Sequence, residues 1–92
     1  MSIRWSREAR EDLDRLADFV APYDPARADQ IERELSQAPK SLTMFPRRGP
    51  RLDVFDPREI REYRVGSYVL RYELTDADIV VLRFFHARED RY

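Results

Sequence analysis

The sequence contains no cysteine and only one histidine, and both shortages exclude whole classes of protein. Without thiols the chain can form neither disulfide bonds nor thiolate metal sites, which fits a reducing cytoplasm. His86 alone cannot build a catalytic zinc site, because such a site uses about three protein ligands. We therefore expect no metal site.

Glycine is also scarce, and long apolar runs are absent. Gly49 and Gly66 are the only glycines, so the chain has no glycine-rich loop for a nucleotide phosphate, and we expect no cofactor. Nowhere do about 18 apolar residues follow one another, as a membrane-spanning helix would require. The N-terminal MSIRWSREAR has no apolar stretch behind its charges, as a secretion signal would have. The sequence predicts a cytoplasmic protein without membrane contact.

The composition predicts one folded domain over residues 1–92, because 42% of the residues are hydrophobic and 38% are charged. A net charge of −1 argues against general or sequence-specific nucleic-acid binding, which relies on a broad cationic surface that displaces counterions. Sixteen arginines accompany a single lysine. Arginine suits bidentate pairing with carboxylate or phosphate, although a coding bias toward arginine would explain the same ratio.

Helical periodicity dominates the first half of the chain. After a short alternating segment at residues 2–5, apolar side chains recur at helical spacing over residues 7–21. A second helix begins at Pro25, where a proline at the first helical position costs no hydrogen bond. Its apolar stripe continues past Pro39, which we expect to kink or split the helix. The short link at residues 22–24 predicts an antiparallel helical hairpin.

The second half of the chain alternates between apolar and polar residues. This pattern predicts strands over residues 58–65, 68–74 and 79–86, which short loops join as hairpins. The last strand is apolar on both sides, as central strands are, so we infer that residues 2–5 pair with its other edge. The face taken by Arg83 stays open, because the second hairpin loop admits three to five residues.

These elements predict an α+β fold of order β-α-α-β-β-β, with the helical hairpin packed on one face of a mainly antiparallel four-stranded sheet. Pairing across Gly66 and Ser67 sets Val65 opposite Tyr68 and turns one apolar face toward the helices. The other face is expected to be largely polar and carries Glu62, Arg64, Val69, Arg71 and Glu73.

The residue types indicate no catalytic centre. One histidine, no cysteine and serines only at caps, turns or helix surfaces leave no evident nucleophile. The remaining candidates are His86, Arg88 and Arg91 near the C-terminal end, which would suit proton transfer and phosphate binding on RNA. A hydrogen-bonded, inert His86 at the strand end explains the same pattern. We therefore predict no catalytic residue.

The sequence contains four segments that carry a resemblance: IRWSREAREDLDRLADFV, FPRRG, REIREYRVGSYVLRYEL and VVLRFFHARED. In order and spacing they resemble the ParE/RelE superfamily of type II toxins, and the ParE branch most closely. The superfamily's β-α-α-β-β-β fold agrees with the order derived from periodicity. The resemblance implies a toxin that traps DNA gyrase on cleaved DNA and is silenced by a ParD-like antitoxin encoded beside it.

The RelE branch cuts messenger RNA on the ribosome and provides an alternative. Its members carry basic residues on the exposed sheet face, whereas the matching positions here hold Ile60, Glu62 and Val69. A carboxylate and two apolar groups cannot stabilise the charge that develops on a scissile phosphate. Arg88 and Tyr92 do match a cationic and a terminal tyrosine position of that branch. A RelE-like endoribonuclease therefore stays open, as does an attenuated, non-toxic binding module.

We interpret the chain as a non-enzymatic toxin that inhibits gyrase by recognition. The residues expected to contact the target are Arg64, Arg71, His86, Arg88 and Arg91. The resemblance implies that the antitoxin lies across the helical hairpin and the sheet edge. The exposed edge of the strand at residues 58–65 gives a physical motive, because unpaired strand edges recruit partners.

Overall fold

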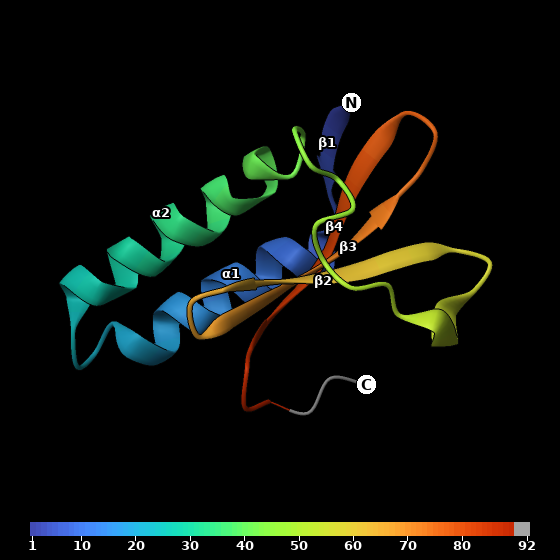
Figure 1. Cartoon of the computed structure of the whole chain (residues 1–92). Helices are drawn as coiled ribbons and strands as arrows, with labels where there is room; N and C mark the ends of the chain where they lie inside the picture. The colour runs from blue at the N-terminus through green and yellow to red at the C-terminus, as the bar shows by residue number, and fades with distance from the viewer. Residues whose placement is uncertain (90–92) are drawn as a thin grey trace.

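Two helices pack on one face of a four-stranded sheet in the computed structural model, which describes residues 1–89 (Figure 1). In chain order the elements are β1 (Ser2–Trp5), α1 (Arg7–Val20), α2 (Pro25–Ser41), the 3-10 turn η1 (Asp53–Phe55), β2 (Glu59–Val65), β3 (Tyr68–Leu74) and β4 (Asp78–His86). The α+β class and the β-α-α-β-β-β order are confirmed. Neither helix in residues 1–89 is long and apolar enough to cross a bilayer.

Both helices begin at side-chain caps. The Ser6 hydroxyl accepts a hydrogen bond from the Ala9 amide at 3.0 Å, and the Asp24 carboxylate accepts one from the Arg27 amide at 3.0 Å. Each cap satisfies an N–H that has no partner within its helix. Of the two outcomes expected at Pro39, a kink or a split, the split does not occur, because α2 continues through Pro39 to Ser41. Pro39 lies in the last turn, where few hydrogen bonds remain to be lost.

The strands are ordered β1-β4-β3-β2, with β1 parallel to β4 and the other pairs antiparallel. The predicted pairing of the first strand with the last is confirmed, and so is the hairpin register that sets Val65 opposite Tyr68. The β3–β4 register shifts between Arg71 and Tyr72, because Arg71 lies opposite Arg83 whereas Tyr72 lies opposite Val81. This bulge places Arg83 beside Arg71 on the sheet face that points away from the core.

The main core lies between the helices and the sheet. Its fully buried members include Ile31 and Leu35 of α2 and Tyr72 and Phe84 of the sheet. Trp5 packs against Phe84 with the ring centroids 5.3 Å apart. The sheet therefore presents its inner face, as predicted, to the helical hairpin.

The outer sheet face is less polar than predicted. Ile60, Val69 and Phe85 are only 1%, 3% and 4% exposed, although they lie outside the main core. The Arg71 guanidinium lies between two aromatic rings on this face, with its Cζ 5.1 Å from the Phe85 ring centroid and 5.3 Å from that of Phe55 in η1. The sequence did not reveal this arrangement, because η1 folds back over the sheet from outside the strand pattern.

The expected exposed edge of β2 is largely covered, which corrects the prediction. The Glu62 amide donates to the Pro50 carbonyl at 3.1 Å, and the Leu52 amide donates to the Ile60 carbonyl at 2.8 Å. Residues 49–52 therefore run along the outer edge of β2 and satisfy its backbone groups from Ile60 to Glu62. The sheet edge that we expected to recruit a partner is occupied there by the chain itself.

Candidate functional site

A groove runs between the second half of α1 and the end of the sheet where β3 begins and β4 ends. Its volume is about 870 Å³, and it is lined by Arg15, Leu16, Asp18, Phe19, Val20, Tyr68, His86, Arg88 and Glu89. The floor is apolar, because Leu16 and Tyr68 are 5% and 7% exposed, and Phe19 projects at the rim with 79% of its surface exposed. A groove with an apolar floor and a charged rim is suited to hold a segment of another protein.

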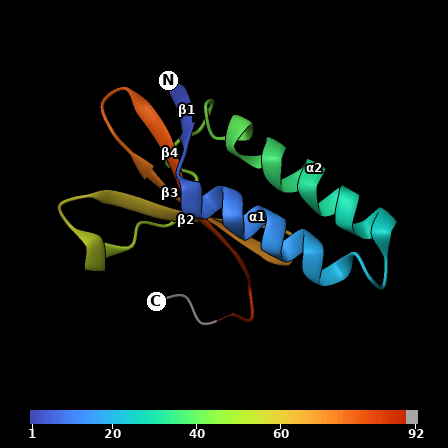
Figure 2. The same cartoon turned by 180° about the vertical axis from the view of Figure 1, so that it is seen from behind.

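The chain after β4 lines the groove with Arg88 and Glu89. Figure 2 shows this segment leaving the sheet and running below α1 in that view. The Ala87 amide donates to the Ser67 carbonyl at 2.8 Å, and the Glu89 amide donates to the His86 carbonyl at 3.0 Å. Arg15 of α1 reaches across and donates to a Glu89 carboxylate oxygen at 3.0 Å. These three bonds fix residues 87–89 along the groove.

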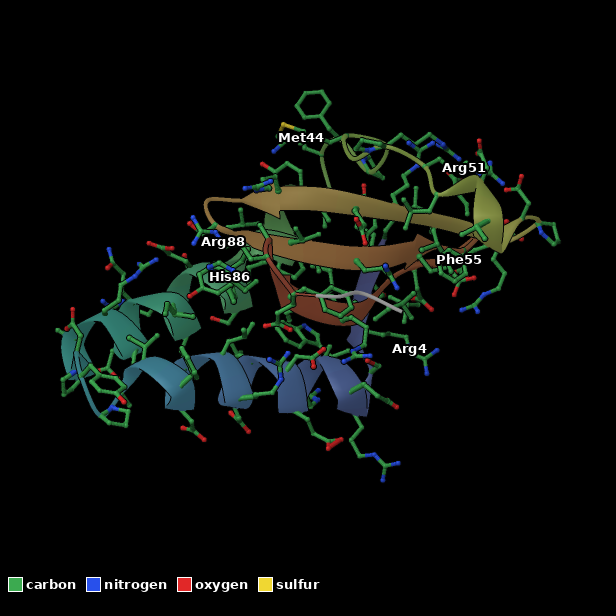
Figure 3. The ribbon with its side chains drawn as sticks, turned by 90° about the horizontal axis from the view of Figure 1, so that it is seen from below. Arg4, Met44, Arg51, Phe55, His86 and Arg88 are labelled. Carbon is green, nitrogen blue, oxygen red and sulfur yellow. The ribbon has the colours of Figure 1, made fainter. Side chains whose placement is uncertain are left out.

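His86 and Arg88 meet at this groove, at the end of the sheet opposite Phe55 and Arg51 (Figure 3). The His86 ring is half-buried and stands edge-on to Tyr68, with the centroids 5.4 Å apart at 88°. Its Nδ1 accepts a hydrogen bond from the Arg88 amide at 3.2 Å. The Arg88 side chain is exposed, and no carboxylate of residues 1–89 lies within ion-pair distance of it. The rim therefore offers a cation to a partner.

Asp12 fixes α1, and with it the groove, against β4. Beyond the end of β1, the Asp12 carboxylate accepts hydrogen bonds from the Phe84 amide at 3.0 Å and from the Arg83 Nε at 2.6 Å. It also accepts Arg15 Nη2 at 3.3 Å. Asp12 is 4% exposed, and its burial raises the pKa, but the bonds from Arg83 and Phe84 outweigh burial and hold the pKa of this carboxyl below its ordinary value. Asp12 thus stays ionised and anchors the helix.

The structure brings together two of the five residues expected to contact the target, His86 and Arg88. Arg64 lies at the same end of the sheet but on the opposite face, where its Nε donates to the Gly66 carbonyl at 3.0 Å. Arg71 lies apart, near the middle of the sheet, with its side chain 14% exposed and bonded to Glu62 at 2.8 Å. Arg91 lies outside the described residues.

Sequence reasoning missed Arg15, Phe19 and Glu89 as members of this site. Phe19 carried a signal, because it is a large apolar residue outside the stripe of α1 that faces the core. Arg15 and Glu89 carried none, since their contact joins residues 74 positions apart in the chain.

Comparisons with known proteins find a family model, a curated relative and a solved structure that each match nearly the whole chain. The model of the protein family described as the ParE toxin of the type II toxin–antitoxin system parDE matches residues 3–91. Toxin RelE1 of Caulobacter vibrioides is 33% identical over 87 residues, which cover 94% of this chain and 92% of that protein. A solved structure described as the chromosomal ParDE TA system from P. aeruginosa aligns with a TM-score of 0.77 at 21% identity, covering 94% of this chain and 95% of that one.

The solved structure shows the same fold, and the family model shows to which family the chain belongs. The match spans both helices and all four strands, including the groove and its rim. The chain belongs to the ParE toxin family of type II toxin–antitoxin systems.

Proposed function

We propose that the chain is a toxin that inhibits DNA gyrase in the cytoplasm by binding the enzyme while its DNA is cleaved, and that a ParD-like antitoxin neutralises it. The toxin would bind gyrase more tightly in the cleaved state than in the resealed state, since only a difference in affinity shifts that equilibrium. A tenfold shift requires about 1.4 kcal/mol. The activity would then lie in recognition and require no bond to be broken by the toxin.

The observation that carries this proposal is the state of the outer sheet face. Three of its arginines pair with carboxylates within the chain: Arg58 with Glu73 at 2.8 Å, Arg71 with Glu62 at 2.8 Å and Arg83 with Asp12 at 2.6 Å. A fourth, Arg64 at the end of the face, donates to the Gly66 carbonyl at 3.0 Å. A cation held by a carboxylate has little charge left for a scissile phosphate. This pairing favours the gyrase inhibitor over the RelE-like endoribonuclease.

The groove supports the antitoxin part of the proposal. Because the edge of β2 is covered from Ile60 to Glu62, the apolar groove is the better surface for an antitoxin segment. A segment bound in the groove would bury Phe19. The same segment would cover His86 and Arg88 at the rim. If these two residues contact gyrase, antitoxin and gyrase cannot bind together, and neutralisation follows from occlusion.

The experiment incubates purified toxin with gyrase and plasmid DNA, followed by detergent and protease. The proposal expects linear DNA that increases with toxin concentration, and at least several-fold less with Arg88→Gln, which removes the rim cation. Arg7→Gln is the matched control, because it removes an arginine whose side chain is 86% exposed at the far end of α1. Unchanged supercoiling at excess toxin would reject gyrase as the target.

The ribonuclease alternative is tested in parallel with messenger RNA on translating ribosomes. Arg88 matches a cationic position of the RelE branch, so ribosome-dependent cuts that disappear in Arg88→Ala would favour that alternative. A protein that produces neither linear DNA nor cut messenger RNA, and that leaves growth unaffected when expressed, would be a non-toxic binding module.

A further inference from the structure

The loop between α2 and β2 forms a second surface, separate from the groove. Residues 43–51, TMFPRRGPR, contain three arginines and no acidic residue. Met44 and Phe45 are 77% and 57% exposed, and together with Pro46, Arg47 and Arg48 they line an open hollow of about 510 Å³. Figure 3 shows Met44 on the side of the molecule farther from α1. Exposed apolar groups beside cations mark this loop as a contact surface.

Arg48 is oriented by aromatic rings and keeps its charge. Its Cζ lies 5.5 Å from the ring centroid of Phe45 and 5.3 Å from that of Tyr63, and its Nη1 donates to the Tyr63 hydroxyl at 3.0 Å. No carboxylate of residues 1–89 lies within ion-pair distance of Arg48, whereas Arg47 pairs with Glu59 at 2.9 Å. Stacking therefore fixes the plane of the Arg48 guanidinium without neutralising it, and further N–H donors remain for an anion.

The loop that carries these groups is held rigidly by the body of the protein. The buried Tyr72 hydroxyl donates to the Pro46 carbonyl at 2.6 Å and accepts the Gly49 amide at 3.2 Å. Arg61 Nη1 donates to the Gly49 carbonyl at 2.7 Å. Exposed aromatic and cationic groups on a fixed backbone lose little conformational entropy when they bind a ligand.

We propose that Phe45 and Arg48 form a contact site for single-stranded DNA. Proteins that bind single strands without reading sequence combine exposed aromatic side chains, on which bases stack, with cations that meet the phosphates. Here Phe45 supplies the ring and Arg48 the unneutralised cation, next to an open hollow of about 510 Å³. The proposal rests on the proposed function for the source of the DNA, which is the strand that gyrase holds cut. A local contact of this kind is compatible with a net charge of −1.

The test measures binding of a fluorescent deoxythymidine 12-mer to the full chain by anisotropy, without gyrase. We expect binding at low salt that weakens as salt rises, because each phosphate contact releases counterions. Phe45→Ala and Arg48→Gln should each weaken binding at least threefold, and Arg48→Gln should flatten the log–log salt slope by about 0.7. Two matched controls should bind like the parent: Tyr23→Ala, which removes an aromatic that is 87% exposed, and Arg7→Gln.

Three results would overturn the proposal. These are absence of binding to the 12-mer, an equal loss in the control variants, or binding of an aspartate- and phenylalanine-containing peptide at Arg48 without binding of DNA, which would identify a protein partner. Because the oligonucleotide assay contains no gyrase, its outcome is independent of the proposed function. Intact DNA binding with no gyrase inhibition would reject the proposed function alone, and the reverse result would reject the DNA contact alone.

Discussion

At the scale of single residues, Asp12 has the largest structural role that the sequence did not reveal. It lies one position before Leu13, which belongs to the apolar stripe of the helix. The pairing of β1 with β4 ends at Val81, and beyond that point the Asp12 carboxylate accepts a hydrogen bond from the Phe84 amide. The helix caps were predictable, because a cap depends on neighbours in sequence. The partners of Asp12 were not, because Arg83 and Phe84 are 71 and 72 positions away.

Replacing Asp12 by asparagine should destabilise the fold. The change leaves Arg83 without its carboxylate and weakens the bond to the Phe84 amide, so the free energy of unfolding should fall by about 2 to 4 kcal/mol. Urea denaturation followed by circular dichroism measures this difference. Asp14→Asn, at an exposed position of the same helix, should change stability by less than about 0.5 kcal/mol. Equal effects of the two changes would contradict the anchoring role of Asp12.

The Asp12 carboxylate should also make the free energy of unfolding depend on pH in the acidic range. The pKa of Asp12 is lowered in the folded state, because the bonds from Arg83 and Phe84 outweigh burial, and that of Glu73 is lowered by the hydrogen bond from Arg58. A lowered folded pKa means that the stabilisation is complete above the unfolded value of about 4 and is lost as the pH falls through the folded value. We expect the free energy of unfolding to decrease below about pH 4, and less steeply in Asp12→Asn. Parallel pH profiles would refute this linkage.

At the scale of elements, periodicity predicted the helices, the hairpin register and the pairing of β1 with β4. It did not predict the segment that covers β2, because residues 49–52 have no alternating pattern and contain Pro50. Pro50 has no N–H and joins the edge only through its carbonyl, which accepts the Glu62 amide. Gly49 is required beside it, since a Cβ there would lie 2.2 Å from the Glu62 carbonyl oxygen.

Gly49→Ala should therefore push this segment away from β2. The clash is with backbone, so the chain must shift, and the hydrogen exchange of the Leu52 and Glu62 amides should accelerate at least tenfold. Gly66→Ala is the control, because its strain arises from a φ of 59° with no atom within 4 Å of the added Cβ. Exchange of the two amides should change little in this control. Equal exchange in both variants would show that the close approach at Gly49 is unimportant.

At the scale of the whole molecule, the fold followed from the order of its elements, but the site did not. The groove arises where α1, the start of β3 and the chain after β4 meet, and no local pattern encodes that meeting. The charges of the outer sheet face are locally balanced, because arginines and acidic residues pair across it. A surface neutralised in this way suits selective recognition of a protein better than broad attraction to nucleic acid.

The central claim is that the toxin acts by preferring one state of its target. The most direct measurement compares its affinity for gyrase on an intact duplex with that for gyrase on a duplex already cut at the cleavage site. Inhibition by recognition predicts at least tenfold tighter binding to the cut complex, which corresponds to about 1.4 kcal/mol. Equal affinity for the two complexes would contradict the account, because a ligand that binds both states alike cannot trap either.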